Sequence, residues 1–227
     1  MEFDLGELFQ RHGAVLLPLV TMISAAGIVL CSIMVLAILI ERSLALRRRR
    51  IMPSGFLEQV QRYWYRGDVK AALDYCDEHP VAIARLVKAG LGRHTADADE
   101  IEKALEAAGQ FEAIELGRHV RGLGVIANLA PMLGFLGTVT GMIKAFQAIA
   151  AAGVSNPSLV ASGISEALLT TAAGLLVGIP SLALFHFFRS RADRFVTEME
   201  KVALELVEDL ASQQRDVSQV QGQADAV

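Results

Sequence analysis

The chain has 227 residues, of which 53% are apolar and 20% are charged, and its mean hydropathy is +0.41. This composition excludes an intrinsically disordered chain and is too apolar for a typical soluble domain. The net charge of −4 argues against a nucleic-acid-binding protein, which would carry a basic stripe. Cys31 and Cys76 lie in an apolar and a polar segment, so we expect two small buried side chains and neither a disulfide nor a metal site.

Three uncharged runs predict three transmembrane helices. Residues 12–40, 122–143 and 167–188 contain no Asp, Glu, Lys or Arg. Each run exceeds the roughly 18–20 apolar residues that cross a bilayer core of about 30 Å. The acidic N-terminus lacks the basic region of a signal peptide, and the apolar run after it is too long for one. We therefore expect the first span to be retained, and we place the spans at residues 16–41, 122–152 and 161–188.

The positions of the basic residues predict the orientation. Arginines follow the first span, precede the second and follow the third: Arg42, Arg47, Arg48, Arg49, Arg50, Arg118, Arg121, Arg189, Arg191 and Arg194. The hairpin at 153–160 is uncharged and contains an Asn-Pro turn signal. Because basic residues stay on the cytoplasmic side, residues 1–15 and 153–160 should lie outside and residues 42–121 and 189–227 inside. A lipid-binding role for the arginine run remains an alternative.

The cytoplasmic segment should be helical. Phe56, Val60 and Trp64 recur at helical spacing, and we expect Trp64 to pack in a core. A further helix should follow with Pro80 in its first turn, where proline is favoured. The run 97–119 begins with acidic residues, which stabilise the positive end of a helix.

An amphipathic helix should extend the third span into the cytoplasm. An apolar stripe runs along this charged segment: Phe195, Met199, Val202, Leu206 and Leu210. We expect the tail from Ser212 to be frayed, because its residues are polar.

The second and third spans are rich in small residues. Gly137 with Gly141 and Gly174 with Gly178 form patterns that let helix backbones approach closely, and Gly134 adds a further small position. We expect leucine at Gly137 or Gly174 to reduce assembly. Two prolines, Pro131 and Pro180, are tolerable if neighbouring groups satisfy the freed carbonyls.

Polar residues within the spans are the candidate functional residues. Burial of Glu166 would cost about 2.5–3.5 kcal/mol on insertion scales, so this residue should face a bundle interior or a water-filled cavity. At about 1.5 Å per residue, Glu166 and Lys144 lie roughly 18 Å and 15 Å from the hairpin tip. Thr138, Thr170 and Thr171 form a second layer about 24–26 Å from the tip.

Structural explanations for these residues stay open. The two charges could sit at the outer interface, where the long Lys144 side chain can reach water. The threonines could bond to carbonyls of their own helices. On a helical wheel Thr170 shares the Glu166 face, whereas Thr171 lies about 140° away.

The sequence contains no conventional catalytic signature. There is no phosphate-binding loop, no His-Glu-x-x-His pattern and no paired-cysteine zinc site. Ser165 and His186 are faintly similar to an intramembrane serine protease dyad, but they lie some five turns apart on one predicted helix. We expect no catalytic residue, no metal, no cofactor and no enzymatic activity.

Two segments closely resemble the MotA/TolQ/ExbB proton-channel family. Residues 131–143 (PMLGFLGTVTGMI) are similar to the family's second-span motif, and residues 163–180 (GISEALLTTAAGLLVGIP) to its third-span motif. The resemblance is specific over about 122–190 and architectural elsewhere. Because MotA-type flagellar stators have four spans, the ExbB/TolQ branch is the nearer relative.

By this resemblance, Glu166 matches the family's intramembrane glutamate, and Thr138 and Thr171 match its threonines in the second and third spans. Two residues depart from the enterobacterial pattern: Thr140 stands where Trp is common, and Thr170 where Ala is common. These departures weaken assignment to ExbB rather than to TolQ or a gliding-type motor.

The resemblance implies an all-α integral membrane protein of the bacterial inner membrane, forming a homo-oligomer, a pentameric bundle around a central lumen. An ExbD/TolR-like single-span partner would occupy the lumen. Proton flow would drive work on the outer membrane through a TonB- or TolA-like protein. Membrane lipids would surround the complex, and we expect no nucleic acid among its partners. The competing function is a non-conducting helical scaffold. A small-solute carrier would need more spans and an inverted repeat.

Overall fold

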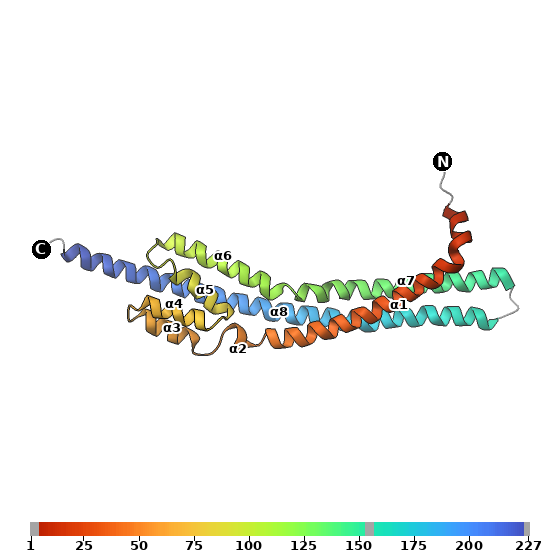
Figure 1. Cartoon of the computed structure of the whole chain (residues 1–227), viewed down its shortest axis with the longest axis horizontal. Coiled ribbons are helices and arrows are strands. Elements are labelled where there is room, and N and C mark those ends of the chain that lie inside the picture. Colours follow the sequence, from red (N-terminus) through yellow and green to blue (C-terminus); the bar gives the residue numbers. More distant parts are fainter. Residues whose placement is uncertain (1–4, 153–156, 225–227) are drawn as a thin grey trace. The chain divides into compact units, whose positions relative to one another are not determined.

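The structure, a computed structural model, describes the backbone of residues 5–152 and 157–224 (Figure 1). Side chains are described for residues 17–150, 158, 160–209 and 212. Helices make up 89% of the chain, and the described backbone contains no strand. Three segments are long and apolar enough to cross a membrane, Leu17–Ala45, Ala98–Ala150 and Val160–Asp209. The all-α class with three candidate membrane helices is therefore confirmed.

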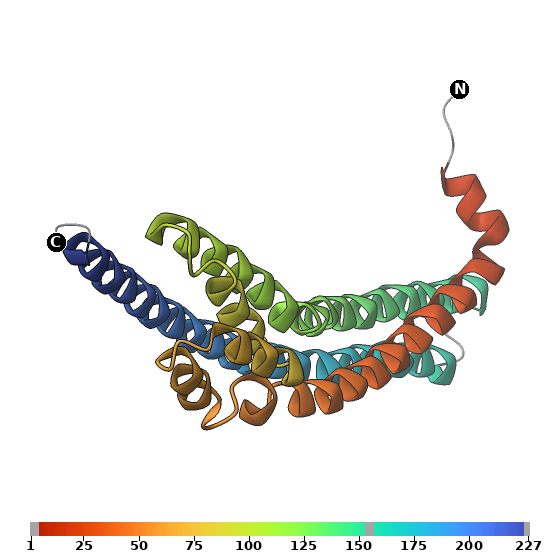
Figure 2. The ribbon, with the colours of Figure 1, turned by 60° about the vertical axis from the view of Figure 1, so that its left-hand side comes forward.

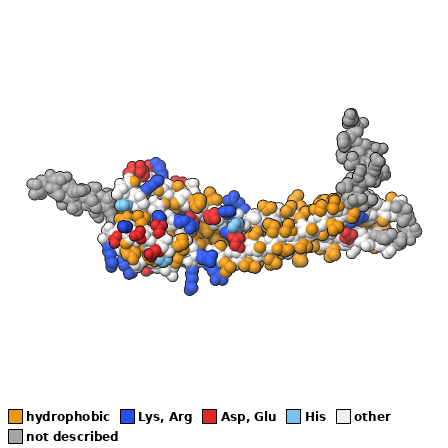
Figure 3. Space-filling model, in the orientation of Figure 1, with side chains coloured by type: hydrophobic (Ala, Val, Ile, Leu, Met, Phe, Trp, Pro, Cys, Tyr) orange, Lys and Arg blue, Asp and Glu red, His pale blue; other side chains and the backbone are white. Residues whose placement is uncertain are grey.

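The chain divides into two compact units. We call the first, Met1–Glu41 with His119–Phe187, the apolar unit, and the second, Arg42–Arg118 with Phe188–Val227, the charged unit. Hydrophobic side chains cover the visible face of the apolar unit, whereas acidic and basic side chains are mixed over the charged unit (Figure 3).

The apolar unit consists of α1 (Leu5–Ala45), α7 (Val120–Ala152) and the first part of α8 (Pro157–Ala224), which run side by side (Figure 2). These helices contain the three predicted spans and are longer than them. α1 already begins within the predicted outer segment 1–15, and it continues through Pro18. Residues 153–156, half of the predicted hairpin 153–160, lie outside the described residues, and residues 157–160 belong to α8.

Glycines bring the backbones of α7 and α8 into direct contact. A Cβ atom added at Gly174 would lie 2.6 Å from the carbonyl oxygen of Ala130 and 3.0 Å from Cα of Gly134. A Cβ at Gly141 would lie 2.7 Å from Cβ of Ala167. Close approach of this kind increases van der Waals contact, which drives helix association where no hydrophobic effect operates.

The glycine contacts lie within one chain, which changes one prediction. Gly137 faces the methyl group of Thr170, and Gly174 faces the α7 backbone of the same chain. A leucine at either position would therefore first separate α7 from α8, whereas the sequence analysis predicted a direct effect on assembly between copies.

The two prolines are accommodated differently. A Cβ added at Gly178 would lie 2.6 Å from Cγ of Pro131 and 3.2 Å from the Ala127 carbonyl oxygen, which the proline ring leaves without its usual N–H partner. Pro180 lies on an exposed face of α8, and the next residue, Ser181, is buried and donates to the Val177 carbonyl oxygen at 2.6 Å. Both helices continue through their prolines.

The charged unit packs short helices against the second part of α8 (Figure 2). These are α2 (Arg48–Ile51), α3 (Phe56–Trp64), α4 (Val69–Glu78), α5 (Ala82–Leu91) and α6 (Ala98–Gly117). Fully buried apolar side chains form the core: Ile83, Leu86, Leu91, Ile101, Leu105 and Met199. Trp64 is buried as predicted, and so are the free cysteines Cys31, in the apolar unit, and Cys76.

The helix ends test the sequence signals. α6 begins after Asp97, whose carboxylate accepts a hydrogen bond from the Glu100 backbone N–H at 2.8 Å, which confirms the predicted start. The prediction for Pro80 is wrong: Val81 is the extended N-cap of α5 and Ala82 is its first residue, so Pro80 precedes the helix. The tail from Ser212, for which the sequence predicted fraying, continues α8 as a helix to Ala224.

One ion pair joins α5 to α6 inside the charged unit. The guanidinium of Arg85 binds both carboxylate oxygens of Glu112, with Nη2 2.6 Å from Oε2. The Glu112 side chain is 2% exposed and that of Arg85 49%. The hydrogen bond to Glu112 raises the pKa of Arg85 above its usual value. A bidentate geometry of this kind satisfies a carboxylate that burial would otherwise destabilise.

Substitution of Arg85 by Met should destabilise the charged unit. It leaves the buried Glu112 carboxylate without its partner, and because Arg85 is half exposed we expect a loss of about 2 kcal/mol. Thermal unfolding in mild detergent, followed by circular dichroism, measures this effect. Lys88→Met is the matched control on the same helix, since it removes a pair with Asp77 in which both side chains are about half exposed, and it should leave the midpoint nearly unchanged. Equal midpoints for both variants would contradict a structural role of the Arg85–Glu112 pair.

Substitution of Gly174 by Ala should weaken the α7–α8 contact. The new methyl group would overlap backbone atoms, which cannot move as a side chain can, so we expect a loss of about 1–3 kcal/mol. Gly117→Ala is the control, because nothing lies within 4 Å of its added Cβ and alanine favours the helix. The thermal unfolding midpoint should fall for the first variant and stay or rise for the second. A fall of equal size in both would contradict the packing argument.

Candidate functional site in the membrane helices

A polar cluster joins the three helices of the apolar unit. The ammonium group of Lys144, on α7, donates to the hydroxyl of Thr21 on α1 at 3.0 Å and lies 3.4 Å from Oε1 of Glu166 on α8. Thr21 in turn donates to the Pro18 carbonyl oxygen at 2.9 Å. Lys144 and Glu166 therefore meet at one depth, as counting from the hairpin predicts, and a third helix is tied to them.

The Lys144–Glu166 pair lies at the surface of a single chain. The Lys144 side chain is 27% exposed and that of Glu166 is 54% exposed. A separation of 3.4 Å is long for a charge-assisted hydrogen bond, which is typically 2.7–2.9 Å. The carboxylate of Glu166 is thus only partly engaged by its own chain, and its second oxygen has room for another donor.

A hydroxyl pair forms the second predicted layer. The Oγ1 atoms of Thr138 on α7 and Thr171 on α8 are hydrogen-bonded to each other. Thr171 Oγ1 lies 3.0 Å from the Gly134 carbonyl oxygen, and Thr138 Oγ1 lies 3.3 Å from the same oxygen and from that of Ala167. Each hydroxyl has one proton, so two arrangements are possible. Either Thr138 donates to Thr171 and Thr171 donates to a carbonyl oxygen, or Thr171 donates to Thr138 and Thr138 donates to a carbonyl oxygen.

The remaining span threonines bond within their own helices. Thr170 donates to the Glu166 carbonyl oxygen at 2.7 Å, and its methyl group packs on Gly137. Thr140 is buried and lies 3.0 Å and 3.1 Å from the carbonyl oxygens of Leu136 and Gly137. The structural explanation that threonines satisfy their own helix thus describes Thr170 and Thr140, whereas Thr138 and Thr171 also bond across helices.

The sequence analysis missed the contribution of α1. Thr21 accepts from Lys144, and the neighbouring Ser24 is fully buried and donates to the Thr21 carbonyl oxygen at 2.9 Å. Both hydroxyls lie in the N-terminal half of the first uncharged run. Counting depth along the first span, as along the other two, would have placed Thr21 near Lys144.

A second titratable pair is formed by two residues at the ends of the sequence segments that make up the apolar unit. Nδ1 of His119 is 2.7 Å from Oε1 of Glu41, and both side chains are nearly half exposed. The sequence analysis did not pair these residues. Among the residues that the structure describes, no group of three His, Cys, Asp or Glu side chains could hold a metal ion.

The three helices carry two separate polar layers, the Lys144–Glu166 pair and the Thr138–Thr171 pair. Lys144 and Thr138 are six residues apart on α7, or about 9 Å along its axis. Carboxylate, ammonium and hydroxyl groups in a membrane interior are rare and mark ion or proton pathways in many proteins.

The sequence of this chain is similar to those of known proteins. The sequence profile of the MotA/TolQ/ExbB proton channel family matches residues 78–201. A biopolymer transport protein, ExbB-like 1, of a Synechocystis species is 31% identical over 201 residues, which cover 87% of this chain and 76% of that protein.

Shorter matches reach proteins named for biopolymer transport in other bacteria. ExbB1 of Vibrio cholerae is 34% identical over 127 residues, 56% of this chain and 55% of its own. ExbB of Salmonella typhimurium is 32% identical over 117 residues, 52% of this chain and 45% of its own. The match thus spans about half the length of these two relatives. Together with the family profile and the three candidate spans, these similarities establish that the chain is a membrane protein of the MotA/TolQ/ExbB proton channel family, ExbB-like in sequence.

Proposed function

We propose that the chain is the stator subunit of a motor driven by the proton-motive force in the bacterial inner membrane. With an ExbD/TolR-like partner, it would couple proton flow to mechanical work on the outer membrane, in TonB-dependent import or a Tol-Pal type system. The observation that carries this proposal is Glu166, a span carboxylate that its own chain leaves half exposed beside Lys144. Membership of a proton channel family supports it.

The half-exposed carboxylate requires a cover other than lipid. A charge facing hydrocarbon is costly, and lipid offers no hydrogen-bond donor to the free oxygen of Glu166. A homo-oligomer in which α7 and α8 surround a central lumen would bring this face into a polar interior. We propose a pentamer on the family resemblance, with Glu166, Lys144, Thr138 and Thr171 toward the lumen and Thr170 behind them as a packing residue.

The partner would supply the group that is protonated and released. A single-span helix with a membrane carboxylate in the lumen would be attracted by Lys144 and repelled by Glu166, so protonation would change its preferred position. A proton that crosses about 150 mV releases roughly 3.5 kcal/mol, from about 2.3 kcal/mol per 100 mV. This energy is sufficient to favour one of two arrangements of the bundle over the other.

The Thr138–Thr171 pair would act below the charged layer. Two hydroxyls that can donate in either direction accept and pass a hydrogen bond without carrying a charge. In this proposal the pair positions water or the partner's carboxylate between the charged layer and the inner end of the spans. The output protein would be TonB- or TolA-like, and no covalent chemistry is involved.

Glu166→Gln should abolish energised function and preserve assembly, because glutamine keeps the size and hydrogen bonding of the side chain but removes its charge. Proton flux into liposomes that contain the chain and its partner measures the effect, and size-exclusion chromatography checks assembly. Glu78→Gln, at an exposed site on α4, is the matched control and should conduct normally.

Graded variants refine the same assay. Glu166→Asp should retain part of the flux, and Thr138→Ala and Thr171→Ala should reduce it more mildly, since water can replace a hydroxyl. Normal flux in Glu166→Gln would exclude a role for the charge. A purified complex without any flux would favour the competing function, a non-conducting scaffold.

The proposed topology places the N-terminus in the periplasm and the C-terminus in the cytoplasm. In a chain without native cysteines, an impermeant thiol reagent added to intact spheroplasts should label Ser158→Cys. The same reagent should spare Ser54→Cys and Ser212→Cys until the membrane is opened, because these exposed positions would lie inside. The reverse pattern would overturn the orientation and the partner assignment with it.

A further inference from the structure

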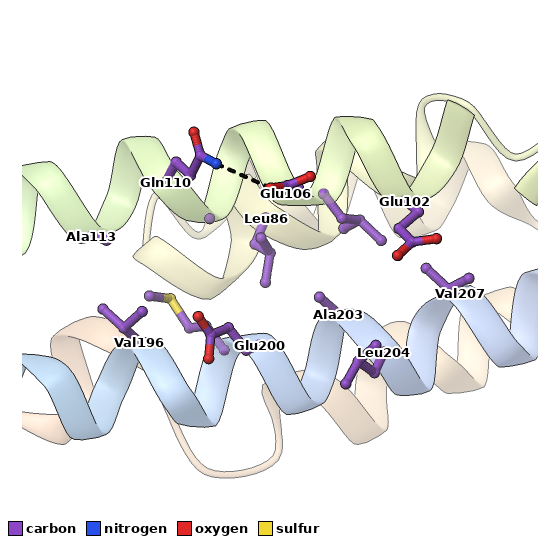
Figure 4. Close-up of a pocket in the computed structure, with 13 residues that line it drawn as sticks. Leu86, Glu102, Glu106, Gln110, Ala113, Val196, Glu200, Ala203, Leu204 and Val207 are labelled. Atoms are coloured by element: carbon purple, nitrogen blue, oxygen red, sulfur yellow. Dashed lines mark hydrogen bonds between the residues drawn. The ribbon is translucent and has the colours of Figure 1, made fainter. Parts of the chain in front are cut away.

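A groove runs between α6 and the second part of α8 in the charged unit, with Leu86 of α5 at its floor (Figure 4). Its volume is about 440 Å³. Its lining includes the small residues Gly109 and Ala113 of α6 and Ala203 of α8, together with the buried side chains of Leu105 and Met199. The groove is thus an open depression with a largely apolar lining, and its volume is sufficient for a large side chain.

The rim of the groove is acidic. Glu102 and Glu106 of α6 and Glu200 of α8 are exposed and line it, and Gln110 donates to Glu106 at 3.2 Å. None of the described side chains that line the groove is basic. An occupant should therefore present apolar side chains with a cation beside them.

The same chain carries a matching surface on another face of α6. Lys103, Ala107, Phe111, Ile114 and Arg118 follow one another every three or four residues and form one stripe, which we call the α6 stripe. Phe111 is 63% exposed and Ile114 58%, although both belong to a helix rich in charged residues. Large apolar side chains that stand out in this way, between two cations, are typical of interaction surfaces.

We propose that the α6 stripe of one copy docks into the groove of the next copy, with Phe111 inserted between α6 and α8 of its neighbour. This inference rests on the homo-oligomer of the proposed function and goes beyond it by naming the surfaces. Because the stripe and the groove are different surfaces, each copy docks its stripe on one neighbour and receives the stripe of the other neighbour in its groove. Head-to-tail contacts of this kind can close into a ring.

Ring symmetry brings the matching residues to the same level. Rotation about the ring axis leaves every atom at its own height, so Phe111 of one copy stands level with Phe111 of the next. The part of the groove nearest that level lies between Gly109 and Ala113, where the small residues are. By the same argument Lys103 stands level with Glu102 and Glu106 of the neighbouring copy, which gives charge complementarity at the rim.

Disulfide crosslinking between two differently tagged chains tests this contact. In a background in which Cys31 and Cys76 are replaced by alanine, one chain carries Phe111→Cys and the other Ala203→Cys. Both sites are on the surface of the charged unit, so folding should be preserved. Co-expression and mild oxidation of the full-length chains should give the mixed disulfide at least tenfold more than a pairing of Glu78→Cys with Ala203→Cys. Because the two cysteines are on different chains, the mixed disulfide can form only where two copies are in contact.

A second variant tests the energetics of the same contact. Phe111→Glu would place a carboxylate against the acidic rim, and we expect this variant to elute as smaller species at concentrations where the unmodified chain is assembled. A preserved oligomer without the mixed disulfide would overturn the proposal. Equal yields from the test and control pairings, or a single-copy protein, would do so as well.

The proton-flux assay keeps the two proposals separate. The docking contact fails if crosslinking fails, whatever the flux of the unmodified complex. The motor function fails if Glu166→Gln conducts normally, even where the crosslink forms. A mixed disulfide that disappears when an excess of a basic amphipathic peptide is added would still support the groove as its site, because the peptide competes for the same surface.

Discussion

The close approach of α7 and α8 is the contact on which the candidate site depends. Because Gly134 and Gly174 have no side chains, the two backbones meet directly, and the hydroxyls of Thr138 and Thr171 come within hydrogen-bonding range of each other and of backbone carbonyls. Larger residues would hold the helices apart and leave these hydroxyls to their own helices. The pairing of the two threonine hydroxyls thus depends on the small residues beside them as well as on the hydroxyls themselves.

The two units are stabilised by different physics. Within a lipid environment the hydrophobic effect does not drive helices together, so the apolar unit depends on close packing and on a few hydrogen bonds that cross between helices. The charged unit buries a conventional apolar core around Leu86, Ile101 and Met199, and it uses the Arg85–Glu112 pair where a carboxylate enters that core. The apolar unit therefore tolerates exposed apolar side chains, whereas the charged unit must bury its own.

Sequence reasoning predicted the parts of the site that follow from distance along a helix. Charge-free runs predicted the spans, and counting from the hairpin placed Lys144 level with Glu166, which the structure brings together. The pairing of Thr138 with Thr171 required the rotation of one helix against another, which a wheel of a single helix does not contain. For the same reason Thr21 was missed, since the position of α1 beside α7 is a tertiary property.

Sequence signals for helix ends were reliable where a side chain makes a specific hydrogen bond to the backbone, and they were weak elsewhere. The carboxylate of Asp97 marked a helix start because it satisfies a backbone N–H. Pro80 did not mark the first turn, since an extended Val81 intervenes before α5. The tail after Ser212 was expected to fray because it is polar, yet α8 continues to Ala224, and glutamine is among the residues with good helix propensity. The groove has no sequence signal, because its walls come from α5, α6 and α8.

The burial of Cys76 has a consequence for how the protein responds to its surroundings. Desolvation, with the nearby Asp77 carboxylate adding to it, raises the pKa of this thiol to about 11. At neutral pH roughly one molecule in ten thousand then carries the thiolate, the form that reacts with peroxides, disulfides and alkylating agents. With the side chain 3% exposed, such reagents also lack access to the sulfur. Both the raised pKa and the burial of Cys76 therefore protect this thiol from oxidation and alkylation.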